Sequence, residues 1–269
     1  MIYRLLYVLC ILFTPPSVYA NWFDNTPLAR TYEALLRNQS QLAWQELHLA
    51  LNQHSISREF WLPIKQEIMQ RSQCGRQLVS YSKPLPADLS LSFVRRSGLS
   101  SQGFQVKLSA ENVNSALEVE LISPVKKAIL RGLLSSQPGY QEIESKEMLQ
   151  EPKAGIYRLK LNGNDYDLVV AIPKNSHWLT LDNITQRVII TPPVVVNSCA
   201  KPVANWQWFS HDYTLLNKRT PIQQFNVPFP NKTQQPKGAK HLSASVSIFE
   251  YQQGLKVEYI QRLAIPFSP

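Results

Sequence analysis

The chain has 269 residues and a net charge of +9 with neutral histidines. This length is enough for one large or two medium domains with proper cores. The nine glycines form no phosphate-binding loop, and none of the five histidines stands in a pattern such as H-E-x-x-H. The composition therefore gives no support to a zinc hydrolase, and we expect neither a metal nor a cofactor.

The first twenty residues have the pattern of a cleavable secretion signal. Arg4 precedes an unbroken apolar run over residues 5–13, and a small-residue site follows at residues 18–20. The apolar run is much shorter than the roughly 20 residues that a membrane-spanning helix needs. We therefore expect cleavage between Ala20 and Asn21 and a soluble mature protein in the periplasm or outside the cell.

The segment over residues 21–75 has helical periodicity. Pro27 marks the first turn of a helix that we expect over about residues 27–37, and a second helical pattern follows a short polar break. A third apolar set at residues 64–69 follows Pro63, which we place in the first turn of its helix because an interior proline would break it. The sequence therefore predicts three short helices.

The first two of these helices form a predicted hairpin over residues 32–51. The hairpin is similar to one tetratricopeptide-type helix pair, but the sequence has no second copy at the expected period. Two interpretations are open. The hairpin is either a small cap packed on the rest of the protein or a surface that binds a protein partner.

Two cysteines, Cys74 and Cys199, lie outside the predicted signal. In an oxidising compartment two cysteines most simply pair with each other, so we expect a disulfide. Two separate buried thiols and a metal or redox pair are the alternatives, although no C-x-x-C spacing supports a metal or redox role.

After Cys74 the period of the pattern changes from helical to alternating. The alternating segments are residues 89–93, 104–109 and 117–121, which predict half-buried antiparallel strands. Asn162-Gly163 stands between two further strand patterns and predicts a tight hairpin turn. With the strand at residues 155–159, the segment over residues 77–173 resembles the immunoglobulin-like modules of many exported bacterial proteins, although it lacks the paired cysteines of antibody domains.

A second β region follows and ends in a predicted hairpin with its turn near Gln253-Gly254. The expected fold is mainly β, with a small helical N-terminal region and two antiparallel β-sandwich domains of immunoglobulin-like type. The expected divisions are a signal peptide at residues 1–20, a helical region at 21–75, a β-sandwich at 76–175 and a second β domain at 176–269.

The richest aromatic stretch contains Trp206 and Trp208, which share one face if this stretch is a strand. Exposed on that face, the two rings could stack on sugar rings of a glycan. Buried, they would belong to the core of a sandwich. Both interpretations are open, and the two tryptophans are candidate binding residues.

A basic loop is expected over residues 228–240, and Lys232, Lys237 and Lys240 within it are further candidate binding residues. Only Arg4 of the 28 basic residues would be lost with the signal, which leaves 27 against 19 acidic residues and a net charge of +8. In an exported protein this balance suits an anionic envelope polymer or an anionic membrane surface better than nucleic acid. Solubility alone explains it equally well.

Taken together, the signal, the Ala43-Trp44-Gln45-Glu46-Leu47 segment, the Cys74-Gly75 step and the strand at residues 155–159 resemble a family of uncharacterised exported proteins of Gram-negative bacteria, a domain of unknown function. Some members are encoded beside two-component sensor genes. The resemblance implies a role in the envelope, and it transfers no site residues.

Three classes of function are open. A non-enzymatic binding or adaptor protein of the periplasm fits the expected sandwiches, the basic charge and the lack of catalytic motifs. A secreted structural protein differs mainly in its final location. A hydrolase of envelope polymers would need a site assembled from distant residues, for example around His211 and Asp212. We expect the first class, without enzymatic activity.

Overall fold

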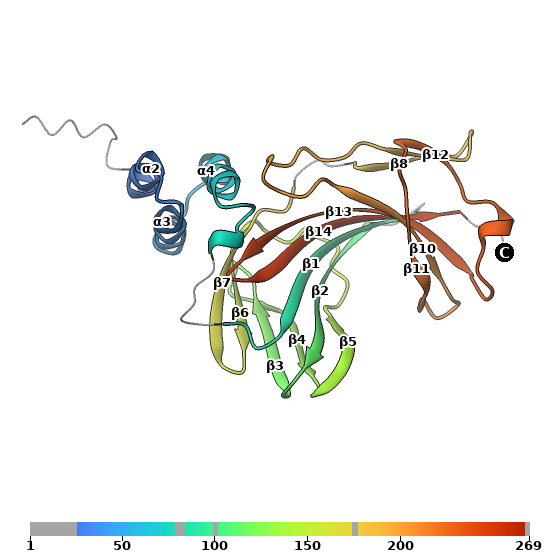
Figure 1. Cartoon of the computed structure of the whole chain (residues 1–269), viewed down its shortest axis with the longest axis horizontal. Helices are drawn as coiled ribbons and strands as arrows, with labels where there is room; N and C mark the ends of the chain where they lie inside the picture. The colour runs from blue at the N-terminus through green and yellow to red at the C-terminus, as the bar shows by residue number, and fades with distance from the viewer. Residues whose placement is uncertain (1–25, 79–83, 99–101, 174–176, 267–269) are drawn as a thin grey trace, which may run out of the picture.

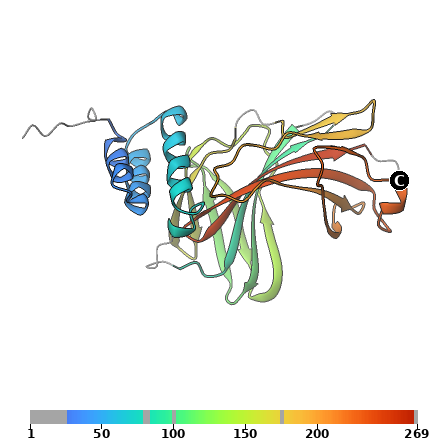
Figure 2. The same ribbon diagram turned by 45° about the horizontal axis from the view of Figure 1, so that its top comes forward.

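The computed structural model describes residues 26–78, 84–98, 102–173 and 177–266. The predicted signal and its cleavage site between Ala20 and Asn21 lie outside these residues. Three helices gather at one end of the molecule, and long curved strands extend away from them (Figure 1, Figure 2). Within the described part of the chain, no helix has the length and apolar character needed to cross a membrane.

The three predicted helices are present as α2 (Ala29–Leu36), α3 (Ser40–Gln53) and α4 (Arg58–Arg71). The predicted place of Pro63 in the first turn is wrong, because α4 begins at Arg58 and Pro63 is its sixth residue. An interior proline removes one helix hydrogen bond and costs about 3 kcal/mol. Burial of Trp61 and Ile64 on either side of it offsets that cost.

The helices form a small core of their own, which is continuous with one edge of the β region. Trp44, Leu47 and Trp61 are buried in it together with Val169, which lies in a β strand, and Ala171, which follows that strand. The helical region is thus packed as a cap on the β region (Figure 1). The use of the same hairpin by a protein partner remains a prediction.

Fourteen strands are described, and they form three sheets. The strands are β1 (Asp88–Ser97), β2 (Gln102–Val113), β3 (Leu117–Ile122), β4 (Ala128–Leu134), β5 (Gln137–Glu144), β6 (Gly155–Leu161), β7 (Asn164–Val170), β8 (Leu179–Asp182), β9 (Arg187–Ile190), β10 (Val203–Phe209), β11 (Leu215–Pro221), β12 (Asn226–Pro228), β13 (His241–Gln252) and β14 (Leu255–Ile265). A seven-stranded sheet has the order β11-β10-β13-β14-β1-β2-β5. A four-stranded sheet has the order β4-β3-β6-β7, and a three-stranded sheet has the order β12-β9-β8.

The expectation of a mainly β fold with an N-terminal helical region is confirmed, but two immunoglobulin-like sandwiches are not. The large sheet takes strands from both predicted β segments, because β1 pairs with β14 in parallel, with Ser90 opposite Lys256. The sheet is therefore mixed, and the predicted boundary at residue 175 does not separate two sheets. Alternation in sequence fixes the face on which a side chain lies, but it carries no information about which distant strand lies alongside.

Both predicted hairpin turns are present. Asn162 and Gly163 have φ angles of 47° and 79°, and they join β6 to β7. Gln253 and Gly254 have φ angles of 50° and 85°, and they join β13 to β14. Two-residue turns of this kind need positive φ at both positions, which asparagine and glycine adopt at low cost.

The large sheet has one apolar face and one polar face. On the apolar face, Leu91, Val106 and Val257 are fully buried, and they belong to one cluster with Leu159 of the four-stranded sheet and Val188 of the three-stranded sheet. The two smaller sheets therefore cover the same face of the large sheet. The polar side chains lie on the opposite face, where the candidate site is found.

Candidate functional site

The polar face of the seven-stranded sheet is hollowed. Two adjoining hollows of about 650 and 460 Å³ share Lys107, Tyr140, Glu142, Arg219 and Arg262 as lining residues, so they form one continuous groove. We call it the polar groove. The volume of each hollow is within the range of ligand-binding sites in proteins.

The polar groove exists because the sheet curls. Tyr140 and Glu142 lie on β5 and Arg219 lies on β11, which are the two outermost strands of the sheet order, and yet both strands line the same hollow. The sheet is therefore an open barrel with the polar groove on its inner side. Barrels of about eight strands are just wide enough to hold side chains or one ligand.

The floor of the polar groove is made of polar side chains that are largely buried. They are Ser92, Gln105, Gln207, Ser243 and Glu258. Some of them satisfy each other: Ser92 donates to Glu258 Oε2 at 3.2 Å, and Gln105 donates to Glu144 Oε2 at 2.6 Å.

Three other polar atoms of the floor have no hydrogen-bond partner within the described part of the chain. They are Gln207 Oε1, Ser243 Oγ and Arg262 Nε. Gln207 lies opposite Ser243 across β10 and β13, and Arg262 lies on β14, the next strand. A buried polar group without a partner costs about 1 to 3 kcal/mol. Three such atoms on neighbouring strands mark a place where hydroxyl or anionic groups of a ligand would find partners.

Three arginines converge at this place. Burial, assisted by the positive charges of Arg96 and Arg219, lowers the pKa of Arg262 to about 10, and the carboxylates of Glu142 and Glu144 partly oppose this shift. Arg262 also lies over the ring of Phe209, 5.4 Å from the ring centroid. Among the described residues none of the three arginines forms an ion pair. This part of the groove therefore carries an excess of positive charge, which the nearby carboxylates offset only in part.

Two carboxylates of the groove, Glu142 and Glu144, are already engaged. Lys107 Nζ lies 3.0 Å from Glu142 Oε1 and also forms an ion pair with Glu144, and Tyr140 donates its hydroxyl hydrogen to Glu142. These contacts hold the two acidic side chains of β5 against Lys107 on β2. They leave the arginines without a carboxylate of their own.

The structure distinguishes between the three predicted lysines. Lys240 is exposed and lines the polar groove, and its amide donates to the Phe209 carbonyl at 2.8 Å. Lys237 is exposed but does not line the groove. Lys232 begins a short 3-10 helix (Lys232–Gln234), and its side chain lies outside the described part of the structure.

The predicted stacking role of Trp206 and Trp208 does not fit the structure. Their side chains are only 6% and 5% exposed and belong to the main core. On a strand the residues between them point to the other face, so Gln207 and Phe209 line the polar groove instead. The alternative interpretation, two core tryptophans, describes their position.

His211 and Asp212 are not brought into a catalytic arrangement. Asp212 accepts hydrogen bonds from the hydroxyl groups of Ser210 and Thr214 in an exposed turn, and these bonds lower its pKa. His211 does not line the polar groove. In the part of the chain that the structure describes, no group of three or more His, Cys, Asp or Glu side chains could hold a metal ion.

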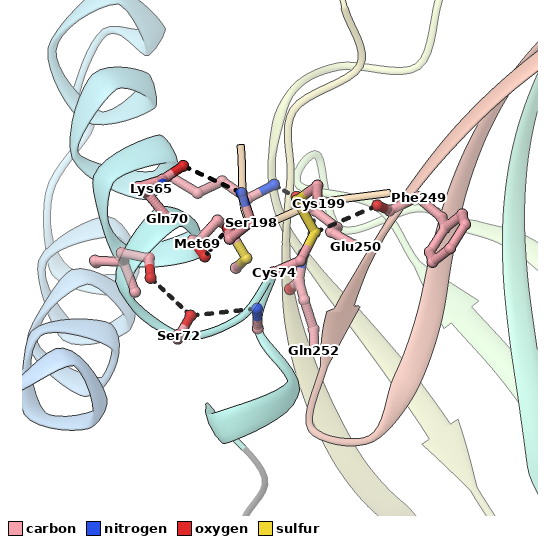
Figure 3. Close-up of a disulfide and its surroundings, with 12 residues drawn as sticks. Lys65, Met69, Gln70, Ser72, Cys74, Ser198, Cys199, Phe249, Glu250 and Gln252 are labelled. Atoms are coloured by element: carbon pink, nitrogen blue, oxygen red, sulfur yellow. Dashed lines mark hydrogen bonds and ion pairs between the residues drawn. A yellow bond between two sulfur atoms is a disulfide. The ribbon is translucent and has the colours of Figure 1, made fainter. Parts of the chain in front are cut away.

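The predicted disulfide between Cys74 and Cys199 is present and ties the end of the helical region to the loop before β10 (Figure 3). Cys74 and Gly75 both have positive φ, 57° and 83°. A Cβ atom on Gly75 would lie 1.9 Å from the carbonyl oxygen of Tyr251, so this close approach of the backbone to β13 requires glycine.

Sequence reasoning missed the three arginines of the polar groove. Arg262 shares one face of its strand with Lys256 and Glu258, and mainly apolar residues stand between these positions. This polar/apolar alternation is visible in the sequence. Its meeting with Arg96 and Arg219 depends on the strand order, for which the sequence has no comparable signal.

Comparison with known proteins places the chain in a family. The family described as "Protein of unknown function (DUF2861)" matches residues 22–268. No curated protein matches the chain. Because the family match spans nearly the whole sequence, the chain belongs to this family of proteins of unknown function, DUF2861.

Proposed function

We propose that this protein is an exported, non-enzymatic envelope protein that binds an anionic glycan in the polar groove. The observation that carries the proposal is the convergence of Arg96, Arg219 and Arg262 without carboxylate partners. Guanidinium groups pair well with carboxylate and phosphate oxygens, and such charge-assisted hydrogen bonds are about twice as strong as neutral ones.

The chemistry of the floor favours a sugar chain over a simple ion. Gln207 Oε1 can accept a hydrogen bond from a hydroxyl group, and Ser243 Oγ can donate to one or accept from one. The stacked rings of Tyr213 and His241, with centroids 4.2 Å apart, line the same groove and offer an apolar surface to a sugar ring. Anionic and hydroxyl recognition together describe an acidic polysaccharide.

Two features support export. The pattern of residues 1–20 is that of a secretion signal, and a disulfide such as Cys74–Cys199 persists in an oxidising compartment. The envelope of a bacterium would then supply the anionic polymer.

A binding titration with matched variants tests the proposal. The probes are a polyuronate, a sulfated dextran and neutral dextran, measured by calorimetry with the mature protein. The groove variant R96Q/R219Q/R262Q removes three positive charges from the polar groove. The control K126Q/K127Q/K201Q removes three positive charges from exposed sites outside it.

We expect the wild-type protein to bind at least one of the anionic polymers and not neutral dextran. The groove variant should bind more than about tenfold more weakly, since each charge-assisted hydrogen bond contributes about 1.5 to 3 kcal/mol. The control should stay close to wild type, and binding should weaken as salt rises. Equal weakening in both variants would mean that net charge alone attracts the polymer. Release of shorter fragments during the titration would indicate a hydrolase instead.

A further inference from the structure

A second cavity lies at the junction of the helical cap and the large sheet. It has a volume of about 630 Å³ and lies between α4, the β13–β14 hairpin and the segment of residues 193–199. We call it the junction pocket. It shares no lining residue with the polar groove, so a ligand there would be independent of the glycan proposed above.

The walls of the junction pocket are mainly apolar. They include Leu62, Met69, Val194, Val195, Val196, Ile248 and Phe249. Val194 is 98% exposed, so this wall of the pocket faces solvent. The segment that carries it is held in place by Cys199 and by Ser198, whose hydroxyl donates to the Met69 carbonyl at 2.9 Å (Figure 3).

A buried ion pair forms the closed end of the junction pocket. Lys65 Nζ lies 2.5 Å from Glu250 Oε1, and the same oxygen accepts hydrogen bonds from Tyr259 Oη at 3.0 Å and from Gln252 Nε2 at 2.7 Å. Figure 3 shows Lys65 and Glu250 facing each other between α4 and β13. The charge of Glu250 is therefore fully used by partners within the chain.

Arg58 is the second cation of the junction pocket, and it has no such partner. Its Nε is buried without a hydrogen-bond acceptor in the described part of the chain. Burial lowers the pKa of Arg58, an effect that the charge of Glu151 only partly opposes. Glu151 and Glu59 are exposed to solvent, and neither forms an ion pair with Arg58.

The start of α4 also lies at this end, where it brings the carboxylate of Glu59 as well as the guanidinium of Arg58. Ser57, Arg58 and Glu59 line the pocket, and the N-cap residue Ser57 makes no side-chain capping bond. The first amide groups of a helix carry a partial positive charge that favours an anion. An unpaired guanidinium, an uncapped helix start and apolar walls thus meet in one cavity.

We propose that the junction pocket binds an anionic amphiphile with a single acyl chain, whose head group pairs with Arg58 and whose chain lies along the apolar walls. The volume is within the range of ligand pockets in proteins. An uncharged chain would leave Arg58 Nε without an acceptor, and a cationic head group would be repelled by Arg58. The pocket should therefore discriminate by the charge of the head group.

The test compares three twelve-carbon probes, all below their critical micelle concentrations: laurate, dodecanol and dodecyltrimethylammonium. Calorimetry with wild-type protein should give saturable binding of laurate with one site, at least about tenfold tighter than dodecanol, which corresponds to ~1.4 kcal/mol. The cationic probe should bind most weakly. Equal binding of the three probes would overturn the proposal, because it would indicate non-specific detergent binding.

Variants locate the site. Arg58→Gln should weaken laurate binding about tenfold and leave dodecanol binding unchanged. Arg30→Gln, which removes the same charge from an exposed position on α2, should leave both unchanged. Val195→Trp should reduce binding of laurate and dodecanol together by filling the cavity. The groove variant R96Q/R219Q/R262Q should bind laurate as wild type does, so the outcome separates this proposal from the glycan proposal. Wild-type binding of laurate by Arg58→Gln would refute the role of Arg58.

Discussion

Lys65 at the junction and Arg262 in the polar groove are both cations with little contact to water, but only Lys65 has an ion-pair partner within the described chain. Lys65 is 3% exposed and has Glu250 at 2.5 Å. Arg262 has an aromatic ring below it and two further arginines near it, and no carboxylate pairs with it among the described residues. The first charge is compensated by the protein itself and belongs to its architecture. The second is offset only in part by Glu142 and Glu144 and forms no ion pair among the described residues, which is the condition expected of a binding site.

The largest expected loss of stability comes from removing the carboxylate that pairs with Lys65 at the junction. Glu250→Gln would leave Lys65 as a buried charge without a counter-ion, which destabilises proteins by about 3 to 5 kcal/mol. Urea unfolding followed by circular dichroism measures the loss. Lys65→Met together with Glu250→Leu should recover much of it, because replacing a whole buried pair by apolar residues is often neutral.

Arg262→Gln is the matched change in the polar groove. Since Arg262 has no carboxylate to leave behind, its removal should change the free energy of unfolding by less than about 1 kcal/mol. A loss of stability as large as that of Glu250→Gln would show that Arg262 also stabilises the fold. The two regions would then not differ in this respect.

The disulfide is the next largest contribution at the junction. It joins residues 125 positions apart, and replacing both Cys74 and Cys199 by alanine should lower stability by about 2 to 5 kcal/mol because the unfolded chain regains freedom. The measurement is thermal unfolding with and without reductant. As a control, protein taken from its own compartment is alkylated before any reductant is added. If both thiols are alkylated, the disulfide does not exist there.

His48 on α3 gives the junction a dependence on pH. Burial lowers the pKa of His48 from 6.5 to about 4, with Asp167 opposing and Lys65 assisting the shift. The unfolded chain therefore binds more protons between these values, so stability is full above pH 6.5 and falls as the pH drops toward 4. The loss should be at most about 3 kcal/mol. His48→Phe, which can keep the edge contact with Trp44, should unfold with a weaker dependence on pH over this range. An unchanged dependence would exclude His48 as its source.

The two regions also differ in how much of them the sequence predicts. The elements and the disulfide of the junction were predictable, because helical periodicity, the Asn162-Gly163 and Gln253-Gly254 turns and the two cysteines are local or paired signals, but the pairing of Lys65 with Glu250 was not. Nor was the polar groove. Its arginines lie on β1, β11 and β14, and only the parallel pairing of β1 with β14 and the curl of the sheet bring them together. No local pattern encodes those two facts.

The two tryptophans of β10 show the same limit of prediction from sequence within a single strand. Alternation correctly places Trp206 and Trp208 on one face and Gln207 and Phe209 on the other. Which of the two faces meets the core depends on the smaller sheets that cover it, and these come from distant parts of the chain. Aromatic content alone therefore could not decide whether the two tryptophans are exposed or belong to the core.

The smallest expected effect concerns the basic loop before β13. Lys240 lines the polar groove and Lys237 does not, although both are exposed and lie three positions apart. Lys240→Gln should weaken binding of the anionic polymer by about 1.4- to fivefold, the equivalent of a surface ion pair of about 0.2 to 1 kcal/mol. Lys237→Gln should leave binding unchanged, and neither variant should alter stability by more than about 0.5 kcal/mol.

Because the two variants have the same net charge, any difference between them reports position rather than total charge. If both weaken binding equally and salt abolishes the effect, the loop attracts the polymer only through long-range charge. The selectivity of the protein would then have to come from the arginines on the floor of the groove alone.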